Sequence, residues 1–138
     1  MQSKYDFRGY RLLKANISRV KDKAITNFTL FCQKGVYNEE NQIFEIISEV
    51  TVTFGDEVNV LVFSSGFKIN DLEWLEVMAD QTVINELFAT VFPFIREKVF
   101  EFTSDFRPGF MIPVLDITKF DLSKKVVFNL NKVEPLAN

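Results

Sequence analysis

Residues 91–97 of the chain are Val-Phe-Pro-Phe-Ile-Arg-Glu, with a proline between two phenylalanines. On both sides of this stretch apolar residues recur every three or four positions, from Ile84 to Phe102. That spacing is typical of one face of an α-helix. Proline inside a helix removes a backbone hydrogen bond and crowds the preceding turn, so we expect a kink or a break at Pro93. The stretch therefore predicts one long, proline-interrupted helix.

The predicted helix is apolar on more than one face, because large side chains such as Leu87 and Phe100 lie outside the main stripe. A helix with two apolar faces needs two surfaces to pack on. We expect these to be the protein's own sheet and a second surface, for which a second copy of the chain is a candidate. The residues expected at the contact between subunits are Phe88, Phe92, Phe94, Ile95 and Val99.

The half of the chain before the helix has the two-residue period of β-strands. The clearest case is 44–54, where apolar and polar residues alternate, and the valines of 58–63 predict a strand that is central or covered on both faces. Short polar turns separate the segments, so the prediction is an antiparallel meander with the helix packed on it, an α+β fold. The four predicted strands are 7–20, 27–33, 44–54 and 58–63.

The helical region is predicted to begin at Asn70, because Asn70 and Glu73 have the spacing of a capping box. It is predicted to end at residues 107–109, Arg-Pro-Gly. The extended segment 110–115 follows, and 126–130 is compatible with either a short strand or a helical turn. Irregular segments rarely carry apolar runs unless they pack or bind something, so this region is either core or a binding surface.

Composition excludes several kinds of chemistry. The chain has 138 residues, the usual length of one domain. It has a net charge of −3, no histidine and one cysteine. Without histidine, neither a histidine-based catalytic pair nor the usual Cys/His zinc site can form within one chain. The acidic balance argues against nucleic-acid binding, and no apolar run is long enough to span a membrane. The 16 phenylalanines exceed what one small core is expected to bury, so part of this surface should meet a partner.

The Phe-Pro-Phe-x-Arg-Glu core of 91–97 resembles a motif in the long helix of the SecB export-chaperone family. The resemblance covers roughly residues 7–121 in the family's order, including the strand at 49–53, the acidic turn at 55–57 and the proline-containing segment 110–115. It implies a four-stranded antiparallel sheet, one domain over 1–138, and a tetramer built as a dimer of dimers. It also implies a cytoplasmic holdase that binds unfolded polypeptides in apolar grooves without ATP or another cofactor. The residues expected to contact the client are Phe67, Trp74, Phe106, Phe110, Met111, Ile112 and Val114.

The sequence departs from the family at two places. The sheet surface that meets the translocase motor is acidic in the family, whereas this chain has Asn16, Val20 and the apolar run 60–63 at the corresponding positions. The tail after Asp121 also does not resemble the family's last helix. Docking to the motor protein is therefore in question. SecB-like proteins encoded beside toxin–antitoxin pairs share this divergence, so the client is either a set of secretory precursors or a single antitoxin.

The alternative function is a ligand-binding or thioesterase-type domain, in which a sheet wraps around a long helix. Such a domain would contain an enclosed pocket. Such a domain would place a carboxylate such as Asp71 or Glu73 near the helix start. An enzyme is not expected, because paired carboxylates such as Glu45 and Glu49 are about 13 Å apart on an extended strand. No metal site is expected, and the N-terminal residues do not resemble a secretory signal.

Overall fold

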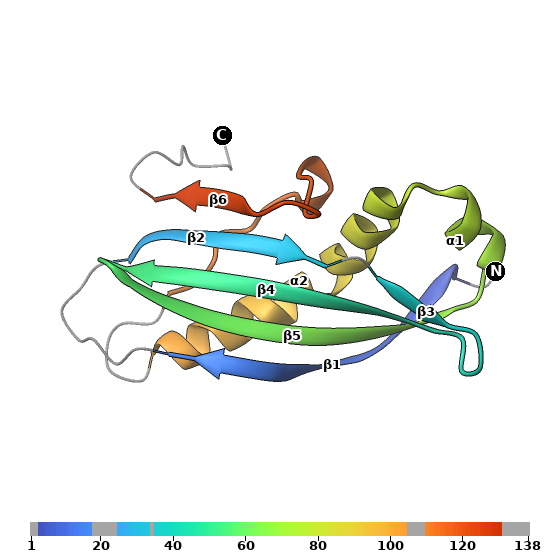
Figure 1. The fold of residues 1–138 in the computed structure, drawn as a ribbon, viewed down its shortest axis with the longest axis horizontal. Coiled ribbons are helices and arrows are strands. Elements are labelled where there is room, and N and C mark those ends of the chain that lie inside the picture. The colour runs from blue at the N-terminus through green and yellow to red at the C-terminus, as the bar shows by residue number, and fades with distance from the viewer. Residues whose placement is uncertain (1–2, 18–24, 34, 105–109, 131–138) are drawn as a thin grey trace.

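The computed structural model describes residues 3–17, 25–33, 35–104 and 110–130. Within these ranges, the strands form one antiparallel sheet, and the long helix α2 crosses one face of it (Figure 1). In chain order the elements are β1 (Tyr5–Asn16), β2 (Ile25–Cys32), β3 (Val36–Asn38), β4 (Ile43–Phe54), β5 (Glu57–Ile69), α1 (Leu72–Val77), α2 (Asp80–Thr103), the 3-10 helix η1 (Ile117–Lys119) and β6 (Val126–Asn129).

The sheet has six strands, not the four predicted. Its order is β1-β5-β4-β2-β6, and the short β3 pairs with β4 beyond the end of β2. The pairs are all antiparallel. The four predicted segments correspond to β1, β2, β4 and β5. The added strands β3 and β6 have three and four residues, too few for a two-residue period to be recognised in the sequence.

The predicted meander is only partly correct. The hairpin from β4 to β5 turns at Gly55, whose φ of 63° is readily adopted by glycine. However, β1 pairs with β5 rather than with β2, so consecutive strands β1 and β2 lie on opposite sides of the β5–β4 pair. The position of β5 between β1 and β4 confirms the prediction that 58–63 is either a central strand or covered on both faces. Its outer face is not fully covered, because Val58 is 55% exposed.

The core lies between the inner face of the sheet and α2. Alternate residues of β4 and β5 point to this face, and α2 contributes the apolar stripe expected from its periodicity. The helix is continuous through Pro93, which lies on its exposed side, so the predicted break is absent. The largest fully buried side chains are Phe28, Phe54, Phe63, Phe67, Phe88, Leu30, Ile46, Leu61, Leu87, Ile95, Ile112 and Leu122.

The helical region begins one residue later than predicted. Asp71, not Asn70, is the N-cap of α1, and its carboxylate accepts a hydrogen bond from the backbone N–H of Trp74 at 3.1 Å. The helix α2 ends at Thr103, with Ser104 as its C-cap, and the predicted Arg-Pro-Gly end at 107–109 lies outside the described residues. Residues 110–116 have no regular secondary structure, and 126–129 form a strand, which decides between the two alternatives left open for 126–130.

Candidate functional site

The segment 110–120 returns along α2 and is tied to the helix at three points. At the helix C-terminus, Thr103 Oγ1 accepts a hydrogen bond from the backbone N–H of Phe110 at 2.8 Å. Further back, Arg96 Nε donates to the carbonyl oxygen of Ile112 at 2.7 Å. Nearer the helix N-terminus, Asn85 Nδ2 donates to the carbonyl oxygen of Phe120. All three contacts hold the backbone of the segment, so its side chains are free to face the core or the surface.

The three helix residues lie on one face of α2 for a geometric reason. Asn85 and Arg96 are 11 positions apart, and Arg96 and Thr103 are 7 apart, which correspond to about three and two turns of an α-helix. The sequence did not single out Asn85, Arg96 or Thr103 as candidate functional residues. The signal that could have found them is this polar row inside an otherwise apolar stripe.

The packing of the segment 110–120 against α2 also accounts for the second apolar face of the helix. We expected a second copy of the chain there, but the chain's own segment 110–122 packs against the helix, with Ile112, Leu115, Ile117 and Leu122 in the common core. The segment therefore completes the subunit. Its inward side chains belong to the fold rather than to a binding surface.

Two large apolar side chains of the segment are exposed. Met111 is 45% exposed and Val114 is 76% exposed, whereas Ile112 between them is fully buried. The hydrogen bond from Arg96 to the Ile112 carbonyl holds the backbone at the buried residue, which has Met111 directly before it and Val114 two positions after it. Of the predicted client-binding residues in this segment, Met111 and Val114 thus present apolar surface, Phe110 does so partly, and Ile112 does not.

Four phenylalanines meet where the segment passes under β2 and β6, and we refer to this group as the aromatic cluster. Phe128 of β6 stacks on Phe28 of β2, with ring centroids 4.7 Å apart and planes 10° apart. Phe120 meets Phe128 edge-on at 5.1 Å, and Phe110 meets Phe28 at 5.5 Å. Such offset and edge-on pairs are the favoured arrangements of aromatic rings. The cluster joins the segment to the edge of the sheet.

The remaining predicted client-binding residues lie elsewhere. Phe67 is fully buried in the core on β5. Trp74 is largely buried, stacks on Tyr5 at 5.5 Å between centroids, and has the Lys4 ammonium above its ring. Phe106 lies outside the described residues. The structure therefore does not bring Phe67 and Trp74 together with Met111 and Val114 on one surface.

The five residues predicted for the contact between subunits are divided by burial. Phe88, Phe92, Ile95 and Val99 pack inside the subunit, whereas Phe94 is 42% exposed. Phe94 lies against the rings of Phe7 and Tyr10 on β1, with centroids 5.6 and 5.7 Å away. Beside it, a hollow of about 370 Å³ between β1 and α2 is lined by Tyr10, Arg11, Leu12, Lys98 and Phe102. We call this surface the β1–α2 edge.

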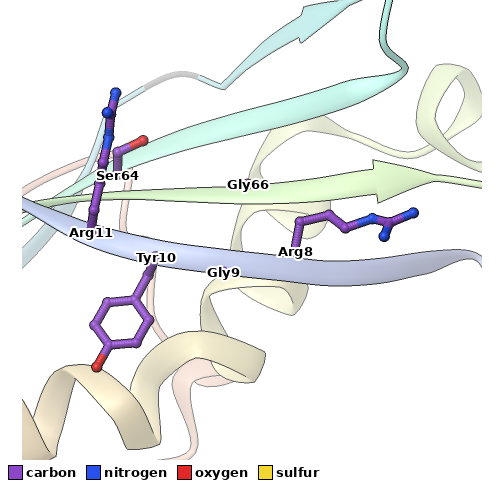
Figure 2. A pocket seen from close by; sticks show the side chains of 6 residues that line it. All are labelled: Arg8, Gly9, Tyr10, Arg11, Ser64 and Gly66. Atoms are coloured by element: carbon purple, nitrogen blue, oxygen red, sulfur yellow. The ribbon is translucent and has the colours of Figure 1, made fainter.

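A second hollow lies where β1 bulges away from β5. It has a volume of about 290 Å³ and is lined by Arg8, Gly9, Tyr10, Arg11, Ser64 and Gly66. Figure 2 shows the side chains of Arg11 and Ser64 on one side of the sheet, whereas Tyr10 points to the other side, toward α2. The hydroxyl of Ser64 donates to the carboxylate of Glu45 at 2.5 Å.

A third hollow, of about 250 Å³, lies at the end of β2 and is lined by Phe31, Cys32, Gln33, Asp80, Gln81, Ile84 and Ser123. None of these three hollows is lined by Asp71 or Glu73, the two carboxylates named as examples for the ligand-binding alternative. Among the described residues, no three His, Cys, Asp or Glu side chains are grouped so as to hold a metal ion. No helix in the described part of the chain is long and apolar enough to cross a membrane.

No protein-family profile and no curated protein sequence matches the chain. Among solved structures, it resembles the Mycobacterium tuberculosis SecB-like chaperone Rv1957, solved in complex with a ChAD peptide from the Rv1956 HigA1 antitoxin. That likeness covers 81% of this chain and 90% of the other, with a TM-score of 0.56 and 17% identity. The chain has the SecB-like fold.

The SecB-like fold confirms the resemblance inferred from 91–97. The predicted antiparallel sheet with one long helix is present, but the sheet has six strands and not the predicted four. A Streptococcus agalactiae protein of unknown function also aligns, over 81% of this chain and 94% of the other, with a TM-score of 0.36 and 19% identity.

Proposed function

We propose that this SecB-like protein is an ATP-independent holdase that binds extended apolar segments of unfolded polypeptides. The observation that carries the proposal is the exposure of Met111 and Val114 on a segment whose backbone is held by α2. A fixed backbone presents these side chains at no further ordering cost when a client binds. Met adapts its shape to different partners, so such a surface suits clients of varied sequence.

Two further features belong to the proposal. The client is a polypeptide, either secretory precursors or one dedicated antitoxin, and the antitoxin peptide bound to the M. tuberculosis chaperone supports the second choice. The working protein is a cytoplasmic homo-oligomer, a dimer of dimers, and the exposed aromatic surface of the β1–α2 edge supports self-association. Docking to a translocase motor is not part of the proposal.

The test uses a double variant, Met111→Ser with Val114→Ser, and a permanently unfolded client, reduced and carboxymethylated lactalbumin. We expect binding measured by fluorescence anisotropy to weaken about tenfold or more, since each apolar side chain removed from a contact contributes on the order of 1 kcal/mol. Thermal stability should stay within a few degrees of wild type, because both side chains are already exposed.

The matched control is Val36→Ser with Val77→Ser, which removes two exposed apolar side chains from β3 and α1. It should leave client binding unchanged. Equal weakening in both double variants would show that the segment is not the binding surface. A wild-type protein that neither binds the client nor prevents aggregation of a denatured enzyme would overturn the proposed function itself.

Whether the client is general or dedicated is a separate measurement. If a toxin–antitoxin pair is encoded beside this gene, affinity for lactalbumin is compared with affinity for peptides that tile the antitoxin. A general chaperone binds these with similar affinities, whereas a dedicated chaperone prefers one antitoxin peptide by tenfold or more.

A further inference from the structure

The edge of β2 is occupied by the protein's own last described strand. β6 pairs antiparallel with β2 over four positions, and Val127 faces Thr29 on the outer side while Phe128 faces Phe28 on the inner side. In Figure 1, β6 lies at the border of the sheet, with β2 as its neighbour. No other described strand pairs with β6. A four-residue edge strand is held by few hydrogen bonds, so it is among the first elements of a fold to open.

Phe128 places its ring inside the aromatic cluster. It stacks on Phe28, meets Phe120 edge-on and is only 7% exposed. Phe110, which belongs to the segment that carries Met111 and Val114, also contacts the ring of Phe28. If Phe128 left, the rings of Phe28, Phe110 and Phe120 would form an aromatic pocket directly beside an unpaired strand edge.

The chain has a suitable hinge for such an opening. Leu122 is fully buried, and its carbonyl oxygen accepts a hydrogen bond from the backbone N–H of Cys32 at 2.8 Å, which anchors the chain before β6. The next three residues, 123–125, are exposed. After β6, the N–H of Leu130 donates to the carbonyl of Thr26 at 3.0 Å. The strand can therefore detach beyond Leu122 while the segment 110–122 stays on α2.

We propose that β6 is an internal occupant of the client site, and that an extended client segment displaces it. The client strand would pair with β2 in place of β6 and insert an aromatic or large apolar side chain in place of Phe128. Strand addition of this kind supplies affinity through main-chain hydrogen bonds and selectivity through a side-chain pocket. The inference rests on the proposed function. It adds a binding mode, a preferred type of client side chain, and a strand of the protein itself that limits client binding.

The two occupants exclude each other, which has a measurable consequence. As long as β6 is docked, only the small open fraction of the protein can bind a client strand, so the apparent affinity is reduced by that fraction. Locking β6 on β2 should abolish this mode of binding. Loosening β6 should strengthen it.

The lock is a disulfide between Thr29→Cys and Val127→Cys, which face each other in the antiparallel register on the outer side of the sheet. Directly opposed residues of antiparallel strands lie within disulfide range. Cys32 stays in place, because its thiol is buried and burial raises its pKa to about 12. The full chain is assayed with reduced and carboxymethylated lactalbumin, first oxidised and then after reduction with a phosphine.

We expect the oxidised lock to bind the client at least about tenfold more weakly than the same protein after reduction. The phosphine-treated wild type and the two single-cysteine variants control for the treatment and for the substitutions. If the oxidised and reduced forms bind equally while the wild type binds the client, the inference is overturned and the proposed function stands. If the wild type binds no client, the proposed function fails first.

A second pair of variants tests the opposite direction. Phe128→Ser removes the ring from the aromatic cluster, and Val127→Ser removes a neighbouring side chain that is 62% exposed on the other face of β6. We expect Phe128→Ser to bind the client several-fold more tightly than wild type and Val127→Ser to match wild type. Equal or weaker binding by a folded Phe128→Ser protein would contradict the displacement of β6. If that variant does not fold, the reversible lock still decides the question.

Discussion

The Nε atom of Arg96 donates to the carbonyl oxygen of Ile112 at 2.7 Å, and this contact ties the middle of α2 to the segment 110–115. Ile112 is fully buried beneath it, whereas Met111 on the preceding position is 45% exposed. One charged side chain thus holds the backbone where a buried residue of the core adjoins an exposed residue of the proposed client surface.

Replacing this arginine should destabilise the protein. Arg96→Met keeps the apolar stem but leaves the buried Ile112 carbonyl without its donor, so we expect a loss of about 1–3 kcal/mol in the free energy of unfolding. The control is Lys98→Met, which also removes a cation from α2 but only breaks an exposed ion pair with Glu101, worth about 0–1 kcal/mol. Equal midpoints for the two variants in urea would contradict a structural role for the Arg96 contact.

Self-association is expected to depend on Phe94. Phe94→Asp places a charge on the exposed aromatic surface of the β1–α2 edge and removes ring contacts with Phe7 and Tyr10. We expect the mass measured by sedimentation to fall toward that of smaller species. Met78→Asp, at another exposed apolar position, should leave the mass unchanged. If wild type has a monomeric mass at micromolar concentration, the proposed oligomer is contradicted. If Phe94→Asp has the same mass as an oligomeric wild type, the contact between subunits does not involve the β1–α2 edge.

The bulge in β1 should be sensitive to any side chain at Gly9. Its φ of +134° is strained for residues with a Cβ, although the space around that position is open. We expect Gly9→Ala to lower the free energy of unfolding by about 1–3 kcal/mol through backbone strain alone. Gly66→Ala on the paired strand is the matched control, because its Cβ would meet only ordinary contact with Ile43 at 3.5 Å. Similar stabilities of the two variants in a thermal melt would argue against strain at Gly9.

The buried thiol of Cys32 predicts a loss of stability at alkaline pH. Burial raises its pKa from 9.0 to about 12, so below pH 9 the thiol is protonated in both states and has no effect. Between pH 9 and 12 the unfolded chain loses this proton more readily than the folded protein, which favours unfolding by up to about tenfold per pH unit. Urea midpoints at pH 8 and pH 10.5 should therefore fall more in wild type than in Cys32→Ala. Parallel falls would mean that other groups cause the alkaline loss.

Periodicity in the sequence was sufficient to predict the parts of the fold that repeat over many residues. The alternation in 44–54 and the helical spacing from Ile84 to Phe102 each extend over several strand or helix periods, so β4 and α2 could be predicted with their buried faces. The motif in 91–97 pointed to the SecB-like fold that the comparison with the M. tuberculosis chaperone confirms. Short elements such as β3 and β6 have no room for a repeat, and they were missed or left open.

Which apolar residues remain exposed depends on the tertiary structure and could not be predicted from local sequence. Phe94 and Ile95 are adjacent apolar residues on α2, yet Phe94 is 42% exposed and Ile95 is fully buried. The same holds for Met111 and Ile112, whose roles are set by hydrogen bonds from α2, a helix distant in sequence. The physical reason is that burial depends on which segments meet across the core, and these contacts join residues that no local period relates. The sequence therefore predicted that apolar surface would be available for a partner, and the packing of 110–130 against α2 and β2 decided where it lies.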